Sequence, residues 1–129
     1  MDLPARDRKV LDASGLDYTV VEDQGMLAVR IRAYPLPPGL SATSTEVMFR
    51  LAPGYPDVPP DMWWLQPGVT TSAGGIIQAT EQVEMHFGLQ WQRWSRHIPP
   101  ESWHSGVDGL KSFLKLLDAQ LALAAGAAA

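Results

Sequence analysis

The segment Tyr55-Pro56-Asp57-Val58-Pro59-Pro60 limits what this chain can fold into more than any other stretch. Proline has no backbone N–H to donate, and its ring fixes φ at about −65°. Three prolines within six residues therefore exclude both a helix interior and a central strand. We predict a rigid, extended crossing here, which separates the elements before it from those after it.

The elements before the crossing are predicted from local patterns. A short helix is expected over residues 4–13, because Pro4 suits a first helical position and Ser14-Gly15 stops the helix. Three strands with β-branched or alternating side chains are expected over residues 18–22, 26–34 and 45–51. The connections between these strands are short, which favours an antiparallel meander.

The elements after the crossing are one short strand and one long helix. The apolar segment 62–65 is predicted to be the fourth strand of the meander. Residues 69–90 show no regular pattern and are expected to be irregular. A helix is predicted over residues 105–123, with Ser105 and Asp108 as its N-terminal capping residues.

The long helix has an apolar stripe that should pack on the sheet. Its apolar residues recur at steps of three and four, at Val107, Leu110, Leu114, Leu117 and Leu121. The sheet residues expected against this stripe are Val29, Ile31, Val47 and Phe49. The neighbours Trp63 and Trp64 should point to opposite faces of their strand, one into the core and the other toward a partner surface.

Size and element order predict an α+β fold. The chain has 129 residues, the length of one domain. We expect that domain over residues 1–123, and a frayed, alanine-rich tail over 124–129. The predicted order is an N-terminal helix, a four-stranded antiparallel meander, the proline-rich crossing, an irregular active-site segment and a C-terminal helix.

Composition disfavours several classes of function. The net charge is −4 with no run of lysine or arginine, which disfavours nucleic-acid binding. No stretch has the apolar length of a membrane span or the pattern of a signal peptide, so the cytoplasm is the expected location. The chain has no cysteine, and its three histidines lack the spacing of a helical zinc site. We therefore expect neither a metal nor a cofactor.

The segment Trp91-Gln92-Arg93-Trp94-Ser95-Arg96-His97 gathers side chains suited to nucleophilic catalysis, and its alternative interpretation is a packed loop with a surface serine. Ser95 is a candidate nucleophile, and His97 is the nearest candidate base. Arg93 and Arg96 are cations that can stabilise an oxyanion. Large buried aromatic side chains are expected to hold this loop in place, and the supporting residues are Trp91, Trp94, Trp103 and Tyr55.

The order of elements around Tyr-Pro-x-x-Pro-Pro resembles the ubiquitin-conjugating enzyme fold. In that family the motif follows the third strand and leads into a short fourth strand. The family's catalytic cysteine lies eight residues before a tryptophan, and here Ser95 lies eight residues before Trp103. The chain is most similar to the prokaryotic family E of ubiquitin-conjugating-like proteins, on the segments 55–62, 91–97 and 103–110.

The resemblance implies an acyl-carrier enzyme with three protein partners. Such an enzyme accepts the C-terminus of a ubiquitin-like protein from an adenylating activating enzyme and passes it to an amine of a protein target. With Ser95 in the nucleophile position, the carried group would be an oxyester. Because a serine hydroxyl is a poor nucleophile at neutral pH, His97 would be needed as a base.

Two departures from the family pattern leave alternatives open. The family's His-Pro-Asn motif is absent between residues 66 and 94, with Gln90 and Gln92 as candidates to replace its asparagine. The nucleophile position holds serine. An inactive protein that only binds the ubiquitin-like protein or the activating enzyme is therefore an alternative. A small serine hydrolase is disfavoured, because no Gly-x-Ser-x-Gly elbow surrounds Ser95.

Overall fold

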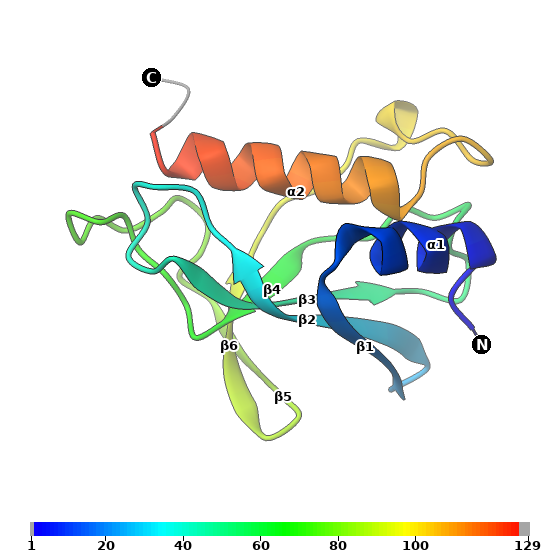
Figure 1. The fold of residues 1–129 in the computed structure, drawn as a ribbon, viewed down its shortest axis with the longest axis horizontal. Coiled ribbons are helices and arrows are strands. Elements are labelled where there is room, and N and C mark those ends of the chain that lie inside the picture. Colours follow the sequence, from blue (N-terminus) through cyan, green and yellow to red (C-terminus); the bar gives the residue numbers. More distant parts are fainter. Residues whose placement is uncertain (1, 127–129) are drawn as a thin grey trace.

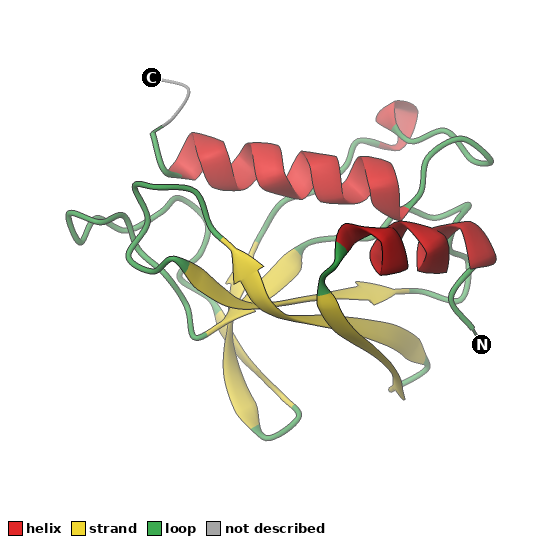
Figure 2. Ribbon diagram, in the orientation of Figure 1, coloured by secondary structure: helices red, strands yellow, loops and turns green. Residues whose placement is uncertain are grey.

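The computed structural model describes residues 2–126 and shows the α+β architecture expected from the sequence. Two helices lie over one face of an antiparallel sheet (Figure 2). The elements in chain order are α1 (Ala5–Ser14), β1 (Asp17–Asp23), β2 (Met26–Pro35), β3 (Ser44–Leu51), β4 (Trp63–Gln66), β5 (Val83–His86), β6 (Leu89–Trp94), the 3-10 helix η1 (Pro100–Ser102) and α2 (Leu110–Ala124).

The sheet has six strands in the order β1-β2-β3-β4-β6-β5, and every neighbouring pair is antiparallel. The predicted four-stranded meander is confirmed as β1 to β4. Two further strands, β5 and β6, form a hairpin that extends the sheet beyond β4 and hangs away from α2 (Figure 1). The expectation that residues 69–90 are irregular was therefore wrong for residues 83–90. Residues 83–86 form β5, which pairs with β6 across the tight Phe87-Gly88 turn.

The main core lies between the sheet and α2, as predicted from the two apolar patterns. The predicted sheet residues are all fully buried there, and these are Val29, Ile31, Val47 and Phe49. Leu110, Leu114, Leu117 and Leu121 of α2 belong to the same cluster. Phe49 meets Phe113 of α2 edge to face, with ring centroids 5.0 Å apart.

A second, smaller cluster lies on the other face of the sheet. It consists of Ala28, Met48, Trp64 and Trp91, with Met62 packed against it. Trp63 joins the main core and Trp64 joins this cluster, so the two tryptophans do point to opposite faces. The expected partner surface at one of them is not found, because Trp64 is 5% exposed and Trp91 of the hairpin packs in the same cluster.

Helix α2 begins five residues later than predicted, at Leu110 rather than Ser105. Asp108 does not cap this helix, because its Oδ2 accepts a hydrogen bond from the His104 N–H. Val107, expected on the buried stripe, precedes the helix and is 78% exposed. Instead, Asp7 Oδ1 of α1 accepts a hydrogen bond from the Leu110 N–H at 3.0 Å, and Ser112 Oγ accepts one from the Gly109 N–H at 3.1 Å.

The other end of α2 continues through Ala124, one residue beyond the predicted end. Residues 127–129 of the predicted tail lie outside the described residues.

The proline-rich crossing is tied to both helical regions. The Tyr55 hydroxyl donates a hydrogen bond to Asp7 Oδ2 at 2.6 Å. Burial raises the pKa of the Tyr55 hydroxyl most, and its hydrogen bond to Asp7 raises this pKa further. The Trp103 indole donates to the Pro56 carbonyl at 2.8 Å. The predicted rigid crossing therefore lies between α1 and the segment that precedes α2.

Truncating the α2 stripe should destabilise the protein. Leu117 is fully buried, so Leu117→Ala should lower the free energy of unfolding by about 2–5 kcal/mol through lost burial and a residual cavity. Leu123→Ala removes the same atoms from a side chain that is 56% exposed, and we expect a change of roughly 0.5 kcal/mol or less. Urea unfolding of both variants measures this difference, and equal losses would contradict the described packing.

Candidate site at the end of strand β6

Ser95 follows the last residue of β6 and lines an open cavity of about 480 Å³. Its N–H donates a hydrogen bond to the Ala79 carbonyl at 3.0 Å, which ties the end of β6 to the preceding loop. That loop and the C-terminal end of α2 form the other walls of the cavity. Its remaining lining residues are Thr71, Ile76, Ile77, Gln78, Ala79, Arg96, Gln120, Leu123 and Ala124.

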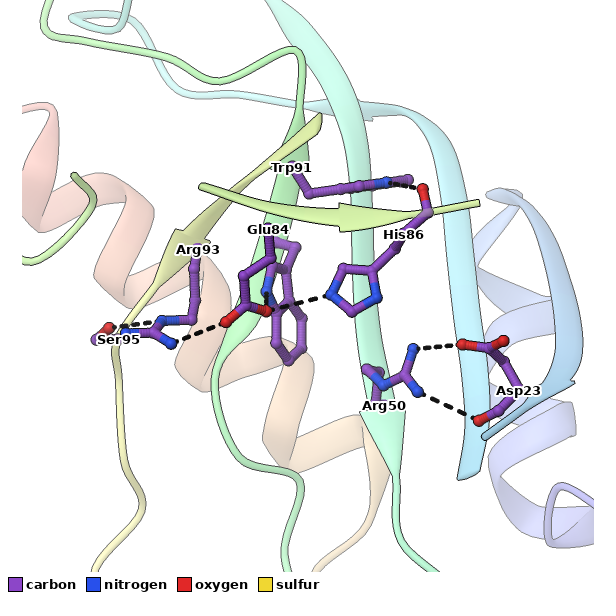
Figure 3. A network of polar contacts seen from close by, with 8 residues as sticks. Asp23, Arg50, Glu84, His86, Trp91, Arg93 and Ser95 are labelled. Atoms are coloured by element: carbon purple, nitrogen blue, oxygen red, sulfur yellow. Dashed lines mark hydrogen bonds and ion pairs between the residues drawn. The ribbon is translucent and has the colours of Figure 1, made fainter. Parts of the chain in front are cut away.

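Of the two arginines proposed to stabilise an oxyanion, Arg93 contacts the Ser95 side chain. Arg93 Nε donates a hydrogen bond to Ser95 Oγ at 3.3 Å. A second N–H of the same guanidinium, on Nη1, donates to Glu84 Oε2 at 2.8 Å. Figure 3 shows Arg93 between these two side chains. The Ser95 oxygen is therefore held by a cation that is itself paired.

Arg96 lies in the same cavity wall but contacts the backbone of Ser95. Its Nη1 is 3.4 Å from the Ser95 carbonyl oxygen, and its Nε donates to Gln120 Oε1 of α2 at 3.2 Å. The guanidinium lies over the Trp94 ring, 5.0 Å from the ring centroid. Burial lowers the pKa of Arg96. Arg96 thus links the end of β6 to α2 and presents charge to the cavity.

His97 is placed away from the Ser95 hydroxyl. Its Nδ1 is 2.6 Å from Asp61 Oδ1, and its side chain is 67% exposed. His97 lines a different cavity, beside Trp103, whereas Ser95 and Arg96 share the first one. Among the described residues, no hydrogen bond joins His97 to Ser95. The Met62 N–H donates to the Arg96 carbonyl at 3.0 Å, which holds this segment beside Asp61 and Met62.

The predicted supporting aromatic residues are buried, although Trp91 and Trp94 lie on a strand and not on a loop. Trp94 stacks on Trp63, with centroids 6.3 Å apart. Trp91 packs in the second cluster, and its indole donates to the His86 carbonyl at 2.8 Å. Trp103 follows η1 and does not open a helix, because α2 starts only at Leu110.

The two glutamines considered as replacements for the missing asparagine are engaged elsewhere. The Gln92 side chain accepts hydrogen bonds from the Val69 N–H and the Trp94 indole, both at 3.0 Å, and donates to the Val69 carbonyl at 2.9 Å. Gln90 is exposed and lines a cavity on the hairpin, apart from Ser95. Gln92 therefore fixes the loop that follows β4.

Glu84 is the site residue that the sequence did not indicate. Besides Arg93, its carboxylate accepts a hydrogen bond from the Trp64 indole at 2.9 Å and lies 3.2 Å from His86 Nε2. Burial alone would raise the pKa of Glu84, but the contacts with His86, Trp64 and Arg93 together lower it. The alternation of Val83 and Met85 with Glu84 and His86 was the signal available for a strand here.

Neither a metal centre nor a membrane span is found in the described part of the chain. No group of three or more potential ligands from His, Cys, Asp and Glu lies together among residues 2–126. Within the same residues, no helix has the length and apolar character needed to cross a membrane.

The sequence matches a known protein family over nearly its whole length. The family model for Prokaryotic E2 family E matches residues 3–124. The chain therefore belongs to the prokaryotic E2-like proteins, which confirms the resemblance inferred from its motifs and the ubiquitin-conjugating-like fold. No curated protein and no solved structure shows significant similarity to it.

Glu84 should titrate below its ordinary pKa of 4.5 in the folded protein. A lowered folded-state pKa stabilises the fold above the unfolded value, and that contribution is lost as the pH falls through the lower folded value. The Trp64 indole N–H signal in NMR spectra should report this titration, because it donates to Glu84. Glu84→Gln should abolish the step and Glu81→Gln, on an exposed residue, should keep it. A midpoint at or above 4.5 would refute the described contacts.

Proposed function

We propose that this chain is a conjugating enzyme that carries the C-terminus of a ubiquitin-like protein as an oxyester on Ser95. The observation that supports this most directly is the cavity of about 480 Å³ that Ser95 and Arg96 line together. Its walls come from the two residues that follow β6, from the loop before β5 and from the C-terminal end of α2, and the proposed tail would enter between them. Membership of the prokaryotic E2-like family supplies the reaction class.

The proposed reaction has two balanced acyl transfers. In the first, Ser95 Oγ attacks the thioester carbonyl of the ubiquitin-like protein on the activating enzyme. The C–S bond breaks, the new C–O bond forms, and the serine proton ends on the released thiol. In the second, an amine of the protein target attacks the ester carbonyl. An amide forms, the C–O bond breaks, and a proton from the amine returns to Ser95 Oγ.

Arg93 and Arg96 stabilise negative charge in these steps. Arg93 Nε already donates to Ser95 Oγ, so it is placed to stabilise negative charge on this oxygen as it gives up its proton and as it leaves. Arg96 is half-buried in the same wall, where its charge is less screened by water. Oxyanion donors of this kind are typically worth about 3–4 kcal/mol each. An oxyester needs this help more than a thioester, because it reacts less readily with amines.

His97 remains our proposed base for Ser95, and this role requires its ring to leave the position described above. In the described position, His97 Nδ1 lies 2.6 Å from Asp61 Oδ1. To act as the base, His97 would exchange this contact with Asp61 for one with the Ser95 hydroxyl.

A second function is favoured by the same His97–Asp61 contact. While His97 stays with Asp61, no histidine or carboxylate among residues 2–126 hydrogen-bonds to the Ser95 side chain, and the chain would then bind the tail of the ubiquitin-like protein without forming a covalent bond. Such a binding module would retain its affinity for the ubiquitin-like protein in Ser95→Ala.

The ester on Ser95 is tested by direct loading. The purified chain is incubated with ATP and with an adenylating enzyme and a ubiquitin-like protein from its own genome, followed by denaturing electrophoresis. We expect an adduct that survives reducing agent and is split by hydroxylamine. Ser95→Ala should abolish it, whereas Ser102→Ala, on an exposed serine of η1, should not. An undiminished adduct on Ser95→Ala would exclude the proposed ester, and binding without any adduct would favour the binding module.

The role of His97 is tested by rate and stability together. His97→Ala should slow loading by roughly 10²–10⁴-fold, the usual contribution of a general base. The melting temperature should stay nearly unchanged, because two thirds of the side chain is exposed (67%). His104→Ala, which alters another exposed histidine, should leave loading at the wild-type rate. A wild-type rate for His97→Ala would mean that His97 is not the base.

A further inference from the structure

The β5–β6 hairpin brings an acidic side chain to the arginine that touches Ser95. Glu84 of β5 lies opposite Trp91 of β6, and Arg93 is two residues further along β6. Residues at i and i+2 share one face of a strand, and diagonal neighbours on paired strands are within reach of long side chains. Glu84 and Arg93 are such neighbours, and their Oε2 and Nη1 atoms are 2.8 Å apart.

The Glu84 carboxylate is itself fixed from the other side. Its Oε1 accepts the hydrogen bond of the Trp64 indole at 2.9 Å and lies 3.2 Å from His86 Nε2. Trp64 is 5% exposed and belongs to the second cluster. One carboxylate oxygen is thus anchored to a packed indole and the other to Arg93. The carboxylate cannot turn without breaking one of these contacts.

Because the guanidinium is rigid, its contact with Glu84 also fixes how it faces Ser95. A guanidinium is planar and its N–H groups point in fixed directions. Holding Nη1 on Glu84 therefore sets the direction of Nε, which reaches Ser95 Oγ at 3.3 Å. Among the described residues, Glu84 and Ser95 are the two side chains that accept hydrogen bonds from Arg93. Figure 3 shows the resulting series of contacts from Ser95 through Arg93 and Glu84 to His86.

We propose that Glu84 is a positioning residue that holds the Arg93 guanidinium against Ser95 Oγ. This inference rests on the proposed function, in which Oγ carries negative charge as it gives up its proton for the attack on the thioester and again as it leaves the ester. Glu84 does not contact Ser95 and acts only through Arg93. Without the carboxylate, the long Arg93 side chain regains rotamer freedom and meets Oγ in a smaller fraction of the molecules.

The first test detects the positioning itself and needs no reaction. In Glu84→Gln, the Arg93 Nε–H signal in ¹⁵N NMR spectra should exchange with water roughly tenfold faster or more, the scale of losing a hydrogen bond to a charged group. Glu81→Gln makes the same change on an exposed residue and should leave the signal unchanged. Ser95→Ala should shift the same signal, because it removes the acceptor of Nε.

The second test measures loading of the full chain by its activating enzyme, ATP and ubiquitin-like protein. Glu84→Gln should slow ester formation roughly tenfold, with the half-saturating concentration of the activating enzyme unchanged. In an Arg93→Gln background, Glu84→Gln should have no further effect on the rate. A merely structural role for Glu84 would slow both backgrounds by the same factor.

The outcomes separate this inference from the function on which it rests. Undiminished loading of Ser95→Ala overturns the proposed function, and the positioning role falls with it. If Ser95→Ala abolishes loading while Glu84→Gln loads at the wild-type rate, the proposed function stands and the positioning role is wrong. Unchanged exchange of the Arg93 Nε–H signal in Glu84→Gln, or equal slowing in both Arg93 backgrounds, also overturns it.

Discussion

The buried carboxylate of Asp7 is the contact on which the arrangement of the two helices and the crossing depends. It is 1% exposed, and its two oxygens accept hydrogen bonds from the Tyr55 hydroxyl and the Leu110 N–H. A buried charge is tolerated only with such partners, and here it also meets the positive end of the α2 dipole. Gly109 adjoins it so closely that an added Cβ would lie 2.8 Å from Asp7 Oδ1. The same helix, three turns later, offers Gln120 to Arg96 in the Ser95 cavity. The placement of the site thus depends on a contact at the far end of α2.

A serine nucleophile is less reactive than a cysteine thiolate, so the chemistry proposed for Ser95 relies more on side chains that are already in place to stabilise charge. A thiolate attacks and leaves readily, whereas a hydroxyl needs stabilisation of charge on oxygen in both directions. The motif spacing aligns Ser95 with the family's cysteine, and beside this serine lie two arginines whose guanidinium groups have fixed partners. Arg93 is held by Glu84, and Arg96 by Gln120 and the Trp94 ring. These groups then need little reorganisation during the reaction. Electrostatic catalysis lowers the barrier mainly because such groups are already oriented toward the developing charge.

Local patterns predicted the parts of the fold that depend on neighbouring residues. Alternation predicted β2 and β3, the prolines predicted the crossing, and the leucine repeat predicted the buried face of α2. The start of α2 was missed in part because the Leu110 N–H is bound by Asp7, more than a hundred residues earlier in the chain. The position of His97 was missed for a similar reason. Its partner, Asp61, comes from the segment after the crossing, which no spacing within 91–97 reveals. Arg93 was predicted, but Glu84, which holds it, lies on the other strand of a hairpin, within a segment expected to be irregular.

The distribution of tryptophan has a consequence for how this protein can be observed. All five tryptophans are buried, and they lie on β4, on β6 and after η1. Neither α1 nor β1 carries one. Intrinsic fluorescence therefore reports on the half of the molecule that contains Ser95. Stopped-flow fluorescence would follow events around the cavity with no added dye, while far-UV circular dichroism would follow the helices.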